Sequence, residues 1–378
     1  MSDLNDETPT TFDLAQIKLP RRMGNNPIAY AERAYTPDSC LLGNRYLTRK
    51  SGMFFIGPSG QGKSTAIMQS VVCWSCGRSA FEIEPASALR ILLVQAEDDD
   101  DDLTDMARVA DHLELSTAEK QLVRQNAWIE TVNDKLGIFA TNLIREFLAE
   151  HPCDLLIINP YTAYLDGSIQ DDEINSKFLR TNLQTIANEH NCALLIVHHT
   201  PKTNFRQNTG KWSTMDWMYS GAGAAVLTNW ARAIIAIDPM GESGVFKFIA
   251  AKRGQKIGWR DRVNYFRHDA RQGVLLWTKA DHDEIAQAAS DKGGRAISSA
   301  DVCAAVPIVE GIRKMALREK LQKAGATQRV AKECIEIALD EGFINEIKTK
   351  GDGHTSNIKM IYRSENAPLL FTANGQTN

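Results

Sequence analysis

Short runs of consecutive hydrophobic residues, separated by longer stretches that mix hydrophobic and polar positions, recur between residues 40 and 280. Such runs are typical of strands buried on both faces of a parallel sheet, and the mixed stretches are typical of the helices that cover it. The pattern therefore predicts an α/β domain with a mostly parallel sheet, ending in antiparallel strands at one edge. The predicted strands are Met53–Ile56, Ile91–Gln95, Leu155–Ile158, Ala193–Val197, Ala233–Ile237, Val245–Ala251, and a hairpin of Val263–Arg267 with Val274–Trp277.

A different pattern begins after residue 280. Residues 281–297 lose the alternation and predict a linker. Residues 298–363 predict three helices, because apolar positions recur at helical spacing between Ser299 and Leu339, and then a β-hairpin across the turn at Gly351-Asp-Gly-His354. Three helices followed by a hairpin predict a small winged helix-turn-helix domain. We predict a disordered tail at 1–20, the α/β domain at 21–280, and a flexible tail at 364–378.

Composition places the chain among ordinary soluble proteins and adds few constraints. Hydrophobic residues make up 43% and charged residues 24%, and the formal net charge of −4 carries no global signature of nucleic-acid binding. The acidic, polar start predicts no secretory signal, and no apolar run reaches the roughly 18 residues of a membrane span. Dispersed cysteines predict reduced thiols and a cytoplasmic protein. They are Cys40, Cys73, Cys76, Cys153, Cys192, Cys303 and Cys334.

The residues after the first predicted strand fit the phosphate-binding loop pattern G-x-x-x-x-G-K-[ST]. Glycines let the loop curl so that backbone N–H groups point at phosphate oxygens, and the following helix adds the positive end of its dipole. Lys63 would reach the β- and γ-phosphates, and the Ser64 hydroxyl would ligate Mg²⁺. We therefore predict ATP and Mg²⁺ as cofactors. The predicted binding residues are Gly57, Ser59, Gly60, Gln61, Gly62, Lys63, Ser64 and Thr65.

Three other strand ends carry polar residues suited to nucleotide chemistry. Glu97 follows the strand Ile91–Gln95, which we predict to lie next to the phosphate-loop strand, where a carboxylate can orient and deprotonate water. The aspartates at 98–102 are more typical of a solvated helix start. Asn159 stands where an acidic residue normally holds the Mg²⁺ shell, and it can contact the metal only through a bound water, without charge. A polar side chain at the end of Ala193–Val197 can sense the γ-phosphate.

These motifs together resemble the RecA-like ATPases. The ordered series is GPSGQGKST, ILLVQAEDD, DLLIINPYTAYL, ALLIVHHTPK, YSGAGAAVLTNWARAIIAI and FKFIAAKRG, which covers about residues 40 to 280. Within that group it is most similar to the RepA-type replicative helicases of plasmids and phages and their AAA-domain relatives. The resemblance implies Glu97 as catalytic base, His199 as γ-phosphate sensor, and a homo-hexameric ring. It also implies that Lys252 and Arg253 act on the neighbouring subunit's nucleotide, with Arg232 as a second candidate. The family carries aspartate at the position of Asn159.

The long loop from Thr200 to Gly223 is the first candidate surface for nucleic acid. Its cations and aromatics, Lys202, Arg206, Lys211, Trp212 and Trp217, suit a single strand, because phosphates meet the charges and bases stack on the rings. In RecA-like proteins this loop faces the bound strand, which the resemblance implies here. A subunit-contact loop is the alternative.

The C-terminal segment is the second candidate surface. Residues 311–363 hold eleven Lys and Arg against seven Asp and Glu. Gln328, Arg329 and Lys332 are predicted to face a DNA major groove from the second helix of the helix-turn-helix. Lys348, Lys350 and Lys359 on the wing suit phosphates. Docking of a protein partner is the alternative.

Three functions remain open. A DNA-acting helicase of a mobile element is the preferred one, a nucleotide-switched replication initiator or regulator is the second, and a small-molecule kinase fits poorly because the late strands have no role in it. Metal or redox chemistry at Cys73 and Cys76, or metal binding at His198 and His199, lacks further ligands at suitable spacing.

Overall fold

The computed structural model describes residues 26–32, 34, 37–200, 212–221, 224–240, 243–290, 299–307, 310–326, 328–350 and 357–365. The predicted tail at 1–20 and most of the tail at 364–378 lie outside this range. The chain divides into two compact units, Met1–Pro37 and Asp38–Asn378. The first contains helix α1 (Pro27–Ala31), which the Asn26 side chain caps by accepting the Ala29 N–H. Everything that follows concerns the second unit.

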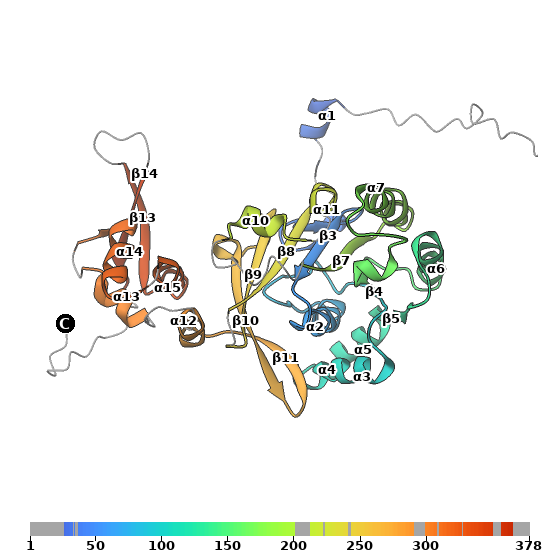
Figure 1. Cartoon of the computed structure of the whole chain (residues 1–378), viewed down its shortest axis with the longest axis horizontal. Coiled ribbons are helices and arrows are strands. Elements are labelled where there is room, and N and C mark those ends of the chain that lie inside the picture. Colours follow the sequence, from blue (N-terminus) through green and yellow to red (C-terminus); the bar gives the residue numbers. More distant parts are fainter. Residues whose placement is uncertain are drawn as a thin grey trace, which may run out of the picture. The chain divides into compact units, whose positions relative to one another are not determined.

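A nine-stranded sheet forms the centre of this unit, in the order β11-β10-β9-β8-β3-β7-β6-β4-β5 (Figure 1). The six strands from β5 to β8 are parallel, and β9, β10 and β11 continue the sheet antiparallel. This is the mostly parallel sheet of the predicted α/β domain. The strands are β3 (Gly52–Gly57), β4 (Ile91–Gln95), β5 (Ala127–Thr131), β6 (Leu155–Asn159), β7 (Ala193–His199), β8 (Ala233–Pro239), β9 (Val245–Lys252), β10 (Val263–Arg271) and β11 (Val274–Lys279).

Every predicted strand is present, and the sheet adds β5, which the sequence pattern did not reveal. Strand β5 reads Ala-Trp-Ile-Glu-Thr and is half-buried at the sheet edge, so it lacks the continuous apolar run of a central strand. A short pair, β1 (Cys40–Leu42) with β2 (Leu47–Thr48), precedes β3.

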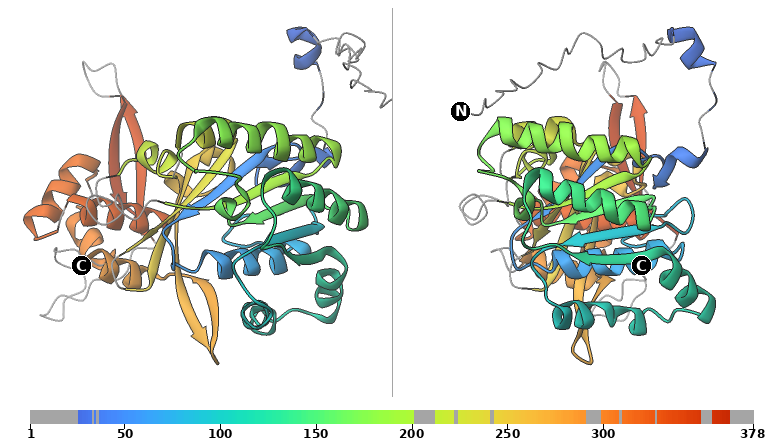
Figure 2. Two further views of the ribbon diagram at one scale, coloured as in Figure 1. Left: turned by 45° about the vertical axis from the view of Figure 1, so that its right-hand side comes forward. Right: turned by 90° about the vertical axis from the view of Figure 1, so that its right-hand side faces the viewer.

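Helices cover both faces of the sheet (Figure 2). Alternate residues of β3 point to opposite faces, so Met53 and Phe55 join one core and Phe54 and Ile56 the other. The first core takes its helical residues from α2 to α5, and the second mainly from α6 to α8. These helices are α2 (Lys63–Ser75), α3 (Asp100–Ala107), α4 (Val109–His112), α5 (Thr117–Asn126), α6 (Gly137–Glu150), α7 (Asp172–Ser176) and α8 (Gln184–Glu189), the last two joined by the π-helical Lys177–Leu183.

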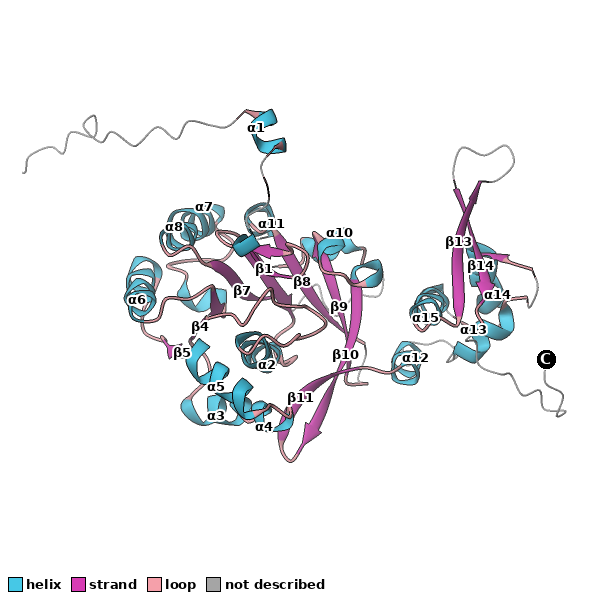
Figure 3. Cartoon of the chain, turned by 180° about the vertical axis from the view of Figure 1, so that it is seen from behind, coloured by secondary structure: helices cyan, strands magenta, loops and turns pink. Residues whose placement is uncertain are grey.

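The C-terminal segment contains the three predicted helices and the predicted hairpin. They are α13 (Ser299–Ala305), α14 (Lys314–Lys323), α15 (Gln328–Asp340), β13 (Ile344–Lys350) and β14 (Asn357–Arg363). A short strand that was not predicted, β12 (Ile312–Arg313), pairs with β14, so the hairpin becomes a three-stranded antiparallel sheet. Figure 3 shows these strands beside α14 and α15.

The segment predicted as a linker contains a helix. Residues 282–290 form helix α12 (His282–Ser290), and residues 291–298 lie outside the described range. Ile285, Ala286 and Ala288 of α12 are buried in a third core with the C-terminal helices. That core also contains Val245 and Tyr265 of the large sheet. Three small or branched apolar residues attach this helix to the core. The helix was not predicted, because so few apolar positions do not give a clear hydrophobic pattern in the sequence.

Candidate active site

The phosphate-binding loop connects β3 to α2 and requires glycine at two positions. Gly60 and Gly62 have φ of +73° and +71°, in the left-handed region where glycine is favoured. At Gly62 a side chain is also excluded by space, because a Cβ there would lie 2.8 Å from the His268 Nε2 atom. Gly62 is the N-cap residue of the 13-residue helix α2. The loop and the helix N-terminus thus form the backbone cradle that the motif predicts for an anion.

Lys63 is held inside this loop and is only 5% exposed. Its ammonium donates to the Pro58 carbonyl at 2.6 Å and lies 3.0 Å from the Nδ1 atom of His199, at the end of β7. Burial lowers the pKa of Lys63 to about 8, and the negative charge of Glu97 opposes that shift. A triphosphate in the loop would restore the charge that burial disfavours.

Ser64 and Asn159 meet at the predicted magnesium site. The Asn159 amide, at the end of β6, donates to the Ser64 hydroxyl at 3.2 Å, and Asn159 is only 4% exposed. These residues fit Mg²⁺ as one direct hydroxyl ligand and one neutral amide that reaches a bound water. Mg²⁺ sites of this kind normally use one or two carboxylates with the substrate phosphates. The site therefore leaves more of the cation's charge to be balanced by the phosphates.

Glu97 follows β4, but β4 does not lie next to the phosphate-loop strand as we predicted. Strands β6 and β7 stand between β4 and β3. The adjacency was wrong because sequence order does not give strand order when helical crossovers separate the strands. The exposed Glu97 carboxylate still acts on the site, since its charge opposes the lowering of the Lys63 pKa by burial and adds to the raising of the Tyr164 pKa by burial. Of the following aspartates, Asp99 caps α3 by accepting the N–H groups of Asp101 and Asp102, so they do form a helix start.

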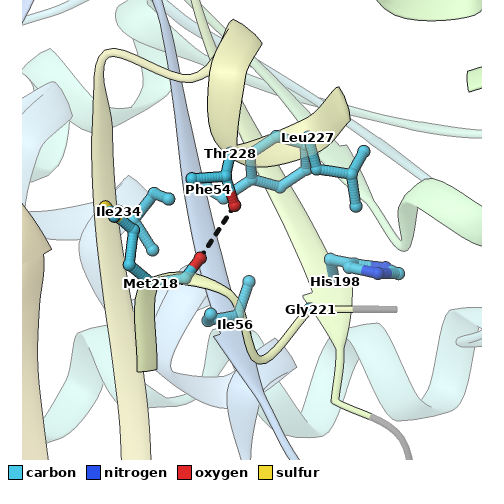
Figure 4. A pocket seen from close by; sticks show the side chains of 8 residues that line it. All are labelled: Phe54, Ile56, His198, Met218, Gly221, Leu227, Thr228 and Ile234. Carbon is cyan, nitrogen blue, oxygen red and sulfur yellow. Dashed lines mark hydrogen bonds between the residues drawn. The ribbon is translucent and has the colours of Figure 1, made fainter. Parts of the chain in front are cut away.

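The two adjacent histidines have different surroundings. His199 contacts Lys63, whereas His198 is fully buried. Figure 4 shows His198 beside Phe54, Leu227 and Gly221, lining a cavity of about 10 Å³. A cavity of that size holds at most about one water molecule. Across the residues that the structure describes, no group of three or more His, Cys, Asp or Glu side chains is arranged to hold a metal ion.

Cys73, on α2, and Cys76, the C-cap residue of α2, are buried free thiols. Burial raises the pKa of the Cys73 thiol to about 12, which makes it a poor nucleophile and a poor metal ligand at neutral pH. The pair packs against the sheet.

Two residues near the loop were not anticipated. The Trp277 indole donates to the Thr65 hydroxyl at 3.0 Å, and the Gln69 side chain makes two 2.9 Å hydrogen bonds to the Trp277 backbone. His268 pairs with Trp277 across the β10–β11 hairpin. Burial lowers the pKa of His268 to about 4, so its imidazole is neutral at pH 7. No local signal marks either residue, because they lie some 200 positions after the loop and reach it only through the sheet.

Lys252 and Arg253 lie at the opposite end of the sheet from the phosphate loop of the same chain. Lys252 pairs with Ile234 at the start of β8, which runs parallel to β3, and the loop follows the other end of β3. The Lys252 ammonium donates to the Thr228 carbonyl at 2.6 Å. Burial and the charge of Arg232 lower the pKa values of both Lys252 and Arg253. The three cations therefore form a cluster away from the chain's own nucleotide site.

The first candidate nucleic-acid surface is partly helical. Helix α10 (Thr214–Met218) occupies its middle and is capped by Ser213. Trp217 is only 2% exposed, so it belongs to the core rather than to a stacking surface. Trp212 lies against it, with 4.8 Å between ring centroids. Lys202, Arg206 and Lys211 lie outside the described residues.

The C-terminal candidates lie beside a cleft. Gln328 and Lys332 are exposed, as predicted, and line this cleft together with residues of the large sheet. The exposed Lys332 is on α15, and Lys359 is on β14. The backbones of Arg329, Lys348 and Lys350 lie in α15 and β13, and their side chains are outside the described set.

Comparison with known proteins finds a family match for the part of the chain that carries this site. Residues 32–204, which carry the phosphate loop, Glu97, Asn159 and His199, match the family of the AAA domain. The match places the phosphate loop within an AAA domain at residues 32–204. Among solved structures, the chain is similar to the crystal structure of the RadB recombinase, with 14% identity, a TM-score of 0.38, and coverage of 60% of this chain and 90% of that one. No curated protein matches significantly. In the described part, no helix has the length and apolar character to span a membrane.

Because the pKa of Lys63 is near 8, ATP binding should take up protons in mildly alkaline solution. At pH 8.5 much of Lys63 is neutral, and phosphates that bind beside it draw a proton onto it. Affinity should fall as the pH rises from 7.5 to 9.5, by up to about tenfold per pH unit. Calorimetry in two buffers of different ionisation enthalpy measures the uptake. Lys63→Arg, which stays charged, is the control, and zero net uptake in the wild-type protein at pH 8.5 would contradict the assignment.

Proposed function

We propose that this ATPase acts on DNA as a homo-hexamer, as a replicative helicase of a plasmid, phage or other mobile element. The observation that carries the proposal is the contact between the phosphate loop and the strand that leads to the candidate DNA loop. Lys63 touches His199, and the next residue, Thr200, donates its N–H to the Gly57 carbonyl at 3.1 Å. A change in what the loop holds therefore reaches the segment after Thr200 directly.

Each residue of the site has a defined task in ATP hydrolysis. Lys63 and the backbone N–H groups of the loop bind the phosphates, and the 3.0 Å contact lets His199 respond when Lys63 turns to the γ-phosphate. Mg²⁺, held by Ser64 and by Asn159 through water, would neutralise charge that develops on the phosphates. Glu97 orients the attacking water and accepts its proton. Phosphoryl transfer depends mainly on such positioning and charge stabilisation.

The position of Lys252 and Arg253 supports assembly into a ring. They cannot serve their own chain's nucleotide, because they lie at the far end of the sheet. Holding Lys252 and Arg253 close to Arg232 costs free energy, because like charges repel and burial disfavours the charged forms. A bound anion would offset that cost. In a head-to-tail ring the anion would be the neighbour's triphosphate, and a basic residue supplied across the interface is a known means of accelerating phosphoryl transfer.

The C-terminal domain, which we assign as a winged helix from its three helices and hairpin, would contribute DNA or partner binding. Its elements follow the order expected for that fold, and Lys332, Arg329 and Lys350 supply basic residues on α15 and β13. Lys202, Arg206, Lys211 and Trp212 are the corresponding candidates in the ATPase domain.

Steady-state ATP hydrolysis with and without single-stranded DNA tests the proposal. We expect DNA to raise the turnover rate severalfold, because a motor couples hydrolysis to the strand it moves. A forked duplex with one labelled strand then measures ATP-dependent unwinding. A turnover rate that is the same with and without DNA, together with no unwinding of the forked duplex, would refute the helicase proposal. Phosphate transfer from ATP to a small metabolite would instead favour a kinase.

A second candidate, an ATP-switched replication initiator or regulator, is favoured by Asn159. A neutral amide beside Ser64 leaves Mg²⁺ with one carboxylate fewer than such sites normally have. If ATP binds tightly and turnover is negligible, Asn159→Asp distinguishes the cases. A rise of about tenfold or more in the variant indicates that the amide limits hydrolysis, and an unchanged low rate with intact ATP-dependent DNA binding favours the switch.

A further inference from the structure

A large cleft separates the antiparallel strands β9 and β10 of the central sheet from the C-terminal helices. It is lined by α10, by β9 and β10, and by α14 and α15, and its volume is about 1090 Å³. Pockets that enclose one small ligand measure roughly 300–1,000 Å³. This cleft is therefore large enough for a segment of an extended polymer. It does not touch the phosphate loop, so it is a separate site.

The charge that remains in the cleft is positive. Six basic and four acidic residues line it within the described part. Two of the acidic residues are engaged by lysines, since Lys247 pairs with Glu333 at 3.1 Å and Lys314 with Glu336 at 2.7 Å.

Three lining cations, Arg313, Arg318 and Lys332, have no carboxylate within ion-pair distance among the residues that the structure describes. Unpaired cations gathered on facing walls of a cleft are suited to a polyanion.

Arg318 gives the strongest indication of a ligand. Its Nε atom is buried and has no hydrogen-bond partner in the described structure. A buried donor without a partner is costly, and a guanidinium more so than a neutral group. Because Arg318 lines the cleft, its guanidinium can donate to a phosphate oxygen there, in the charge-assisted geometry that arginine favours. The nearby Lys332, on the adjacent helix α15, would bind a second phosphate.

The opposite wall offers an aromatic surface. Trp212 is partly exposed and lines the cleft, and its ring is fixed by the buried Trp217 behind it. A ring held in this way at a partly open wall is suited to stacking an unpaired base. Tyr265 also lines the cleft, but it is only 9% exposed and carries Lys247 at 5.7 Å from its ring centroid. Stacking is therefore assigned to Trp212.

We propose that this cleft binds single-stranded DNA, with phosphates at Arg318 and Lys332 and a base on Trp212. The inference rests on the proposed function and names the path of the strand. A single strand fits better than a duplex, because the base that stacks on Trp212 must be unpaired. The strand would run beside α10, directly after the candidate loop that begins at Thr200.

Fluorescence anisotropy with a labelled oligothymidine, on the full chain with ATP bound, tests the cleft. The Arg318→Ala/Lys332→Ala double variant should lose at least about tenfold in affinity. The slope of log affinity against log salt should fall in magnitude by about 1.4, about 0.7 for each phosphate contact removed. Trp212→Ala should also lose about tenfold, with an unchanged salt slope. Lys323→Ala, an exposed cation on the same helix α14 outside the lining, is the matched control and should bind as wild type.

The outcomes separate this inference from the proposed function. If the wild-type chain binds no DNA, the DNA-acting function fails. If it binds single strands and the double variant binds them equally well, only the cleft assignment is overturned. Preference for duplex over single strand would overturn it as well. Circular dichroism melting of each variant establishes that it is folded, and Arg318→Lys, which keeps the charge, should recover part of the affinity.

Discussion

Lys63→Ala should lower the rate of ATP hydrolysis by about 10²–10³-fold and weaken nucleotide binding. The ammonium is the one side-chain cation inside the phosphate loop, and it already lies against the Pro58 carbonyl and His199. Removing it leaves the β- and γ-phosphates with backbone donors only. The loss is large because Lys63 is only 5% exposed, and charge interactions are stronger where water is excluded.

The Lys63→Ala variant should remain folded, so that a loss of activity can be attributed to the missing ammonium and not to unfolding. Burial lowers the pKa of Lys63 to about 8, below that of a free lysine, so the charged form is disfavoured in the folded chain. Replacing it with alanine removes this cost, and the melting temperature should not drop. Titration with a fluorescent ATP analogue and a coupled phosphate-release assay measure the two effects. Hydrolysis near the wild-type rate would show that the loop is not the active site.

Glu97→Gln should lower turnover by about 10²–10⁴-fold while ATP still binds. Glutamine keeps the size of the side chain and its hydrogen bonding but cannot accept the proton of the attacking water. The exposed carboxylate is not part of the phosphate loop, although its charge reaches Lys63. Binding should therefore change by less than about tenfold, in contrast to Lys63→Ala.

Single-turnover hydrolysis compares the variant with Asp100→Asn, a neighbouring exposed carboxylate in the first turn of α3. The Asp100 control should hydrolyse ATP at the wild-type rate. Equal losses in both variants would mean that negative charge along this segment matters in general, and that Glu97 is not the base.

The strands of the core were predictable because the physics that forms them is local in sequence. A central parallel strand is buried on both faces and reads as a continuous apolar run, as in Leu155–Ile158 and Ala193–Val197. Edge strand β5 and helix α12 were not predicted, because each is only partly buried and therefore lacks a continuous apolar run. Trp217 looked like a stacking residue and is a core residue, because an aromatic near basic residues has the same sequence signature in both settings.

The candidate active site likewise has a part that is local in sequence and a part that depends on contacts between distant residues. The phosphate loop is a contiguous segment whose glycines, lysine and serine act through one turn of backbone, so the sequence alone predicted both the loop and the ATP that it would bind. Its contacts to Asn159 and His199 depend on which strand ends stand side by side, and its contacts to His268 and Trp277 depend on a hairpin about 200 residues later.

The sequence by itself predicted the α/β class, ATP as the nucleotide, the phosphate loop and the polar residues at the strand ends. Only the tertiary structure decided that β4 is separated from β3, that Lys252 and Arg253 lie at the far end of the sheet, and that Lys332 faces a cleft. The reason is that hydrophobic periodicity reports whether a residue is buried, whereas strand order and domain docking depend on contacts between residues far apart in the chain.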